Sequence, residues 1–253
     1  MVRDLKADFN DDGLLVIKNV LDRNDILVLL EELEAAIEED KVNYPNVFDK
    51  GMVHNCMARG VHMAKLLDNP TLNKYVKKLL APTCIVYAYQ SSSLFPGNGN
   101  YGSRIHVDSP RFIPNYITNL GVIFPLNDFT LENGATYFLP GSHKYEQLPS
   151  EEFFYKNAKR ALCQAGDMIV FHGRLVHAAG HNNSLETRHS LTINLCRSYM
   201  RQRFDFPRLV SQYTIDQLGD DGKRLIGMNV RMPTSLDEFY LPEEHRLYKS
   251  NQG

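Results

Sequence analysis

The most constraining feature of this chain is a set of metal-ligand residue types that lie far apart in the sequence. His106 and Asp108 are two residues apart, and this spacing on an extended strand places both side chains on one face. His177 follows 69 residues after Asp108, so only a folded barrel can bring it to the same point. Two imidazoles and one carboxylate form the facial triad that binds non-haem Fe(II) and leaves coordination positions open. The pattern therefore predicts a β-rich fold built around one metal site.

Arg188 extends this pattern, because it lies eleven residues after His177 and beyond the polar turn 180–184. If the turn joins two antiparallel strands, the guanidinium lies one layer deeper than the metal ligand. A planar guanidinium can bind a carboxylate through two parallel hydrogen bonds. A metal triad with a deep arginine is what an Fe(II) enzyme that consumes 2-oxoglutarate and O₂ requires.

Each of these residues also has a purely structural interpretation. His-x-Asp arises by chance on strands, and an arginine after a turn is often a solvated charge. His172, His181 and His189 compete with His177 as the second imidazole ligand. We prefer His177, because His172 would lengthen the step to the arginine to sixteen residues. We predict structural roles for His172 and for His143, which lies in a turn.

The composition excludes several classes of protein. A length of 253 residues is ordinary for a single all-β barrel with helical additions, and 43% hydrophobic residues suffice for a core. A net charge of −2 gives no electrostatic reason to expect nucleic acid. Residues 1–8 contain no apolar signal stretch, and no run approaches membrane-spanning length. The four cysteines are widely spaced without a C-x-x-C pair, which argues against zinc or a disulfide framework. We expect a cytoplasmic monomer or small homo-oligomer.

The order of predicted elements indicates a single domain, 1–253, of mainly β structure with helical additions. Residues 1–83 should form a strand, 13–17, and helices that pack on the barrel. Asp22 can cap the first helix, whose acidic face we expect to be solvated, and a second helix should cover 70–80. Residues 84–200 should form the barrel core and 201–253 a C-terminal cap. The predicted core strands are 85–90, 104–108, 118–126, 135–139, 161–164, 168–172, 176–179 and 188–199.

Three longer motifs resemble the phytanoyl-CoA dioxygenase family of Fe(II)/2-oxoglutarate-dependent oxygenases. The motifs are Gln90…Phe95-Pro96-Gly97…His106-Val107-Asp108, Glu132-Asn133-Gly134-Ala135-Thr136…Pro140-Gly141-Ser142-His143, and Gly166-Asp167…His172-Gly173-Arg174-Leu175-Val176-His177 closed by Arg188. Their order and spacing match over essentially the whole chain. One departure is Ile105, where relatives commonly carry tryptophan before the first metal histidine.

The resemblance implies a double-stranded β-helix, a cupin-like jelly roll, with Fe(II) held by His106, Asp108 and His177. It implies that Arg188 anchors 2-oxoglutarate. Thr136 matches a family position with a hydroxyl near the co-substrate, or it is a plain strand residue. Gln90 matches a position that faces substrate or co-substrate, or it is a buried amide satisfied by backbone. Alternation with Gly121 and Ile123 makes Asn119 a further co-substrate candidate.

The implied activity is oxidation of an unactivated C–H bond, by default hydroxylation, with release of succinate and CO₂. Desaturation, epoxidation and cyclisation use the same chemistry and stay open. Two other classes also stay open: a cupin-type isomerase that does not use O₂, and a binding module without catalytic activity. We expect a small-molecule substrate of specialised metabolism, and clustered cations would suit an anionic group. Candidate substrate contacts are Arg104, Arg111, Phe112, Asn115, Tyr116, Arg174, Tyr199, Arg201 and Arg203.

Overall fold

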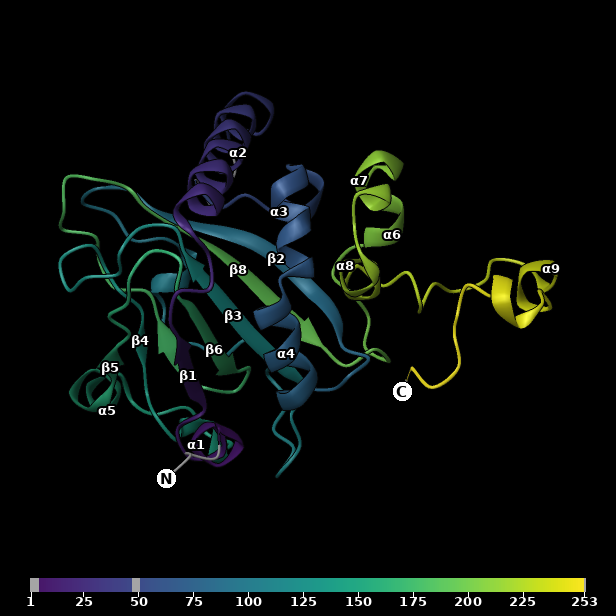
Figure 1. Cartoon of the computed structure of the whole chain (residues 1–253). Coiled ribbons are helices and arrows are strands. Elements are labelled where there is room, and N and C mark those ends of the chain that lie inside the picture. Colours follow the sequence, from purple (N-terminus) through teal and green to yellow (C-terminus); the bar gives the residue numbers. More distant parts are fainter. Residues whose placement is uncertain (1–4, 47–50, 253) are drawn as a thin grey trace.

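The computed structural model describes residues 5–46 and 51–252, where two antiparallel sheets combine with helices (Figure 1). The strands are β1 (Leu14–Ile17), β2 (Ile85–Leu94), β3 (Asn119–Pro125), β4 (Tyr137–Phe138), β5 (Lys159–Arg160), β6 (Met168–His172), β7 (His177–Ala178) and β8 (Arg188–Cys196). The α-helices are α1 (Leu5–Asp12), α2 (Arg23–Asn43), α3 (Val61–Lys65), α4 (Pro70–Leu79), α5 (Glu151–Asn157), α6 (Phe206–Leu209), α7 (Gln212–Asp216), α8 (Asp220–Leu225) and α9 (Leu236–Phe239). Short 3-10 turns are η1 (Cys56–Ala58), η2 (Leu66–Asp68), η3 (Tyr101–Ser103), η4 (Ser142–Lys144) and η5 (Glu243–His245).

The strands form a larger and a smaller sheet, and every strand pairing within them is antiparallel. The five-stranded sheet has the order β1-β6-β3-β8-β2, and the three-stranded sheet has the order β5-β4-β7. The longest ladder joins β2 to β8, from Ile85 opposite Cys196 to Leu94 opposite Arg188. Two antiparallel sheets with added helices are consistent with a jelly-roll-like fold.

The larger sheet separates a helix-side core from the space between the sheets. On β3, Leu120, Val122 and Phe124 belong to the core that the helices cover, whereas Ile123 belongs to a second core shared with the smaller sheet. Figure 1 shows α2, α3 and α4 lying over one face of the larger sheet. Because side chains alternate along a regular strand, every second residue of β2, β3, β6 and β8 faces the space between the two sheets.

The first long helix begins as its sequence predicts. Asp22 accepts a hydrogen bond from the backbone N–H of Asp25, and the Asp25 side chain accepts one in return, which completes a capping box. The acidic face, however, is not simply solvated. Glu32 accepts hydrogen bonds from the first backbone amides of α3, and Asp40 pairs with Arg59 at 2.7 Å. Within the described part of the chain, no helix combines the length and apolarity needed to cross a bilayer.

Two predicted strands are absent as strands. Residues 104–108 are held by a single bridge between His106 and His177, and the predicted strand 161–164 by one between Phe129 and Cys163. In both places the chain makes one pair of backbone hydrogen bonds and then turns away. The predicted extended segments are therefore present near the expected positions, but they do not propagate into ladders.

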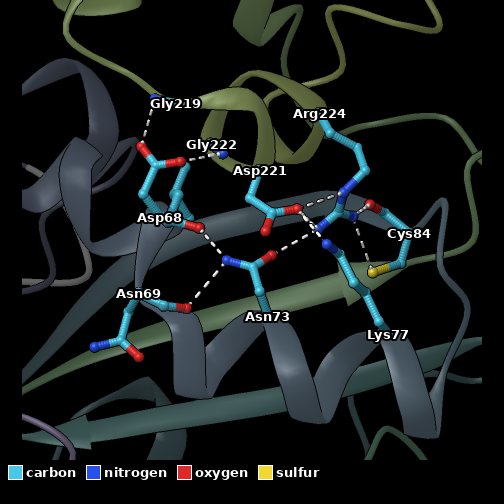
Figure 2. A network of polar contacts seen from close by, with 10 residues as sticks. Asp68, Asn69, Asn73, Lys77, Cys84, Gly219, Asp221, Gly222 and Arg224 are labelled. Atoms are coloured by element: carbon cyan, nitrogen blue, oxygen red, sulfur yellow. Dashed lines mark hydrogen bonds and ion pairs between the residues drawn. The ribbon is translucent and has the colours of Figure 1, made fainter.

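A polar network anchors the C-terminal helices to the N-terminal ones (Figure 2). Asp68 accepts hydrogen bonds from the backbone amides of Gly219 and Gly222 at 2.9 and 2.7 Å. The buried Arg224 donates to the Asn73 side chain at 2.6 Å and to the carbonyl oxygen of Cys84. These bonds fix α8 against η2, α4 and the start of β2 in the larger sheet.

Candidate active site

The structure brings His106, Asp108 and His177 together between the two sheets. Their ligand atoms all lie within 4.8 Å of one another. The Asp108 Oδ1 atom is 3.6 Å from His106 Nε2 and 3.7 Å from His177 Nε2. These distances are too long for hydrogen bonds. Three donor atoms this close together could converge on one metal ion.

The two histidines are aligned by their backbones. His106 and His177 exchange a pair of backbone hydrogen bonds, each 3.0 Å long. The Nδ1 atom of His106 lies 2.7 Å from the carbonyl oxygen of Arg104, and that of His177 lies 2.9 Å from the carbonyl oxygen of Leu175. A proton on each Nδ1 leaves the Nε2 lone pair directed toward Asp108, which is the tautomer a metal ligand needs.

Two aromatic rings fix the orientation of His177. Phe138 of β4 stacks on the imidazole with centroids 5.6 Å apart, and Phe171 of β6 meets its edge at 4.9 Å. Burial lowers the pKa of His177 to about 4, while the carboxylate of Asp108 opposes this shift. His177 is therefore neutral at physiological pH, and its Nε2 can act as a ligand without losing a proton. The donor set and its protonation fit a divalent first-row metal ion.

Arg188 is a buried cation. Its side chain lies over the ring of Phe129 at 4.2 Å, and Nη1 donates to the carbonyl oxygen of Gly134 at 2.8 Å. Among the described residues no carboxylate pairs with it, and its buried Nε has no hydrogen-bond partner. Burial lowers the pKa of Arg188 to about 9. An unpaired charge at 2% exposure is costly, so this position suits an anionic ligand.

The inner face of β8 continues from Arg188 as a polar row that our sequence analysis missed. Ser190, Thr192 and Asn194 follow Arg188 at steps of two, and the intervening Leu191, Ile193 and Leu195 belong to the helix-side core. Opposite them on β2 lie Ser92 and Gln90, paired with Ser190 and Thr192. The signal was present as strict alternation of polar and apolar residues over 190–195.

Two of the three expected co-substrate contacts, Asn119 and Gln90, lie on strands of the larger sheet, and Thr136 precedes β4 of the smaller one. The Asn119 side chain donates to the Asn194 side chain at 3.2 Å. The Gln90 side chain is not satisfied by backbone alone, because its Oε1 accepts a hydrogen bond from Arg203 at 3.1 Å. Thr136 is buried two residues before Phe138.

The expected substrate contacts divide into two groups. Arg174 is buried, and its guanidinium donates to the carbonyl oxygens of Ser109, Pro110, Tyr145 and Glu146, so it joins two loops and is not available to a substrate. Phe112 lies beside that guanidinium at 5.5 Å.

The second group reaches solvent. Arg104 stacks on the ring of Tyr101, and the hydroxyls of Tyr116 and Tyr199 lie 2.7 Å apart. The other exposed members of the group are Arg111, Asn115, Arg201 and Arg203.

The rival histidines lie outside the triad. His143 and His172 pack against each other at 4.8 Å, and His143 Nε2 lies 3.1 Å from the carbonyl oxygen of Asn10 in α1. The Nδ1 atom of His172 accepts a hydrogen bond from the backbone N–H of Arg174. His189 contacts the Ser93 hydroxyl at 2.8 Å. These contacts agree with the structural roles predicted for His143 and His172.

The family is decided by a match over most of the chain. The family model described as phytanoyl-CoA dioxygenase matches residues 9–190, from α1 into β8. This chain belongs to the phytanoyl-CoA dioxygenase family. The matched span contains every member of the triad and Arg188, so the resemblance seen in the sequence is confirmed.

Relatives within this family match over nearly their whole length. An uncharacterised protein of Mycobacterium tuberculosis is 28% identical over 95% of this chain and 92% of its own. The iron/alpha-ketoglutarate-dependent dioxygenase ausU of Aspergillus calidoustus is 24% identical over 92% of this chain and 83% of its own.

Solved structures share the fold. The non-heme monooxygenase ThoJ, in its apo form, superposes with a TM-score of 0.66 at 19% identity, covering 85% of this chain and 93% of that one. The epimerase SnoN, solved with Fe³⁺, alpha ketoglutarate and nogalamycin RO, gives a TM-score of 0.58 at 18% identity, covering 76% and 82%. Both likenesses concern the arrangement of the sheets and helices.

Proposed function

We propose that this chain is an Fe(II)- and 2-oxoglutarate-dependent dioxygenase that hydroxylates an unactivated C–H bond of a small molecule in specialised metabolism. The observation that carries the proposal is the convergence of His106, Asp108 and His177, together with a buried Arg188 that has no carboxylate partner among the described residues. The ring under Arg188, Phe129, belongs to the same apolar cluster as Phe138 and Phe171, which flank His177. The family membership and the cofactor in the name of the Aspergillus relative support it. Within the proposal, residues 84–200 form a double-stranded β-helix, and 201–253 cap it as part of one domain.

Each side chain has a distinct role in this proposal. His106, Asp108 and His177 hold Fe(II), which when bound supplies the oxidising chemistry that converts 2-oxoglutarate and O₂ to succinate and CO₂. Arg188 pairs with the distal carboxylate of 2-oxoglutarate, and Thr136, Asn119 and Gln90 are available for its remaining oxygens. Phe129, Phe138 and Phe171 exclude water around these polar groups, which strengthens the charge pairing.

The proposal is tested by adding Fe(II) and 2-oxoglutarate anaerobically and recording the visible spectrum. Chelation of the keto acid should give a weak charge-transfer band near roughly 500 nm, as the open positions of such a triad allow. Admission of O₂ should then yield succinate. The isomerase alternative predicts no succinate under any condition, and a silent binding module predicts neither signal. Chromatography of the products then separates hydroxylation from epimerisation, desaturation or cyclisation.

A further inference from the structure

The C-terminal residues 231–252, here called the arm, form an ordered segment without a core. No residue from 231 to 252 is buried. Nevertheless the arm is closed at its base by a bridge between Val230 and Tyr248 and by a 2.9 Å bond from the Lys249 amide to Asn229. Ser235 caps α9, and Glu238 accepts two hydrogen bonds from Thr234. Local bonds of this kind do not by themselves offset the entropy of ordering 22 residues.

The arm exposes large apolar side chains that a monomer would leave in water. Met232 is 82% exposed, Leu236 70%, Phe239 59% and Tyr240 74%. The last three lie on α9 or directly after it. Several exposed apolar side chains of this size on one short segment suit an interaction surface. A 22-residue segment also falls within the about 20–30 residues per side of a standard protein interface.

The arm points away from its own chain. The Asp68 and Arg224 bonds fix α8 on the barrel (Figure 2), and the chain then runs outward, so that α9 lies beyond α6, α7 and α8 in Figure 1. The arm therefore starts from a rigid base and extends where it meets little of its own molecule.

Charge identifies a complementary surface on the same chain. The arm has a net charge of −1, because its four carboxylates, at 237, 238, 243 and 244, outnumber the cations Arg231, Arg246 and Lys249. The segment 197–208, here called the basic strip, has four arginines against one aspartate, and Tyr199 and Phe204 among them are exposed. Within the described residues Arg201 and Arg203 have no carboxylate partner. The net charges of the arm (−1) and of the strip (+3) are opposite in sign, and both segments expose aromatic side chains, so the two surfaces can complement each other.

We propose that two copies of this chain form a dimer in which the arm of each copy lies on the basic strip of the other. Reciprocal exchange gives two equivalent contacts related by a twofold axis, the commonest symmetry of homo-oligomers. The strip also borders the catalytic space, because Arg203 donates to Gln90 on the inner face of β2. In the dimer, the partner's arm would therefore cover the opening beside that strand.

The first test is the mass of the full chain by light scattering after size exclusion. Light scattering should give twice the chain mass for the wild-type protein and a single chain mass for a chain that ends at Val230. Because the arm contributes no residue to the core, circular dichroism and thermal unfolding should show the shortened chain to be folded. A wild-type monomer at all concentrations up to about 100 µM, well above affinities of typical specific interfaces, would overturn the proposal. So would a dimer that survives the truncation.

The second test distinguishes exchange between copies from an arm that folds onto its own strip. Glu243→Arg/Glu244→Arg damages only the arm, and Arg201→Glu/Arg203→Glu damages only the strip. Each variant alone should be monomeric. A mixture should regain dimers, because the intact arm of one variant can meet the intact strip of the other. No association in the mixture, or dimers of either variant alone, contradicts the proposal.

Discussion

The ring of Phe171 lies directly on the α carbon of Gly121, its partner across the β3–β6 ladder. A Cβ atom at position 121 would overlap the ring. The absence of a side chain at Gly121 thus lets Phe171 reach the space between the sheets, where its ring meets the edge of His177. A glycine on a neighbouring strand in this way determines the orientation of a proposed metal ligand.

We expect Gly121→Ala to disturb both packing and metal binding. Displacing Phe171 in a close-packed core should lower the free energy of unfolding by about 1–3 kcal/mol, as overpacking does. It should also weaken Fe(II) binding, because His177 loses its lateral support. Urea unfolding and anaerobic Fe(II) titration measure the two effects. The double variant Gly121→Ala/Phe171→Leu makes room for the methyl group and should recover part of the lost stability; additive losses would show that the two residues do not interact.

Removal of a triad ligand should abolish tight Fe(II) binding without unfolding the protein. His177→Ala and Asp108→Ala should each weaken Fe(II) binding by more than about 100-fold, since even loss of an outer-shell partner costs about 10–100-fold. His181→Ala, which changes an exposed histidine four residues away, is the matched control and should bind normally. If Asp108→Ala still hydroxylates its substrate at the wild-type rate, the triad assignment is wrong.

Arg188→Met should separate co-substrate binding from stability. Without ligand, the variant should be as stable as the wild type or more stable, because a buried unpaired charge is replaced by an apolar side chain. The affinity for 2-oxoglutarate should fall by about 2–5 kcal/mol, because its carboxylate loses a buried charged partner. Thermal unfolding with and without 2-oxoglutarate, and with Fe(II) present, measures both. Arg23→Ala removes an exposed arginine at the start of α2 and should leave this affinity unchanged; equal losses in both variants would point to a general charge effect.

The decrease in the free energy of unfolding at acid pH should depend on Asp167. Burial alone would raise the pKa of this carboxyl, but hydrogen bonds from Lys18 and from the backbone amides of Gln164 and Asn19 lower it below its ordinary value. A lowered folded-state pKa stabilises the protein above the pKa of the unfolded chain, near about 4, and this contribution is lost as the pH falls further. Asp167→Asn should therefore cost about 1–3 kcal/mol at pH 7. Unfolding curves of the two proteins should converge below about pH 4; a gap independent of pH would exclude the charge as the cause.

Several elements were predictable because local sequence determines them. The capping box at Asp22 and the apolar period after it defined α2, and the start of α4 followed from Pro70. The convergence of His106, Asp108 and His177 was predictable because their types and spacing are those of one coordination chemistry. The prediction of a strand at 104–108 was wrong, because one pair of backbone hydrogen bonds between His106 and His177 suffices to hold this segment in place. The prediction that Arg174 contacts the substrate was wrong. Its guanidinium binds carbonyl groups of loops 109–110 and 145–146, and no sequence pattern marks those groups as its partners.

The sequence by itself determined which residues could bind a metal and an anion, because residue type and a period of two specify donors and the face of a strand. Only the tertiary structure decided which of those residues meet. It buried Arg188 with no counter-ion among the described residues, bound Arg174 to carbonyl groups of two loops, and placed Phe171 against Gly121. It also left the arm outside the core. These outcomes depend on contacts between segments that are distant along the chain, and the free energy of such contacts is set by burial and partner geometry, which a linear pattern does not contain.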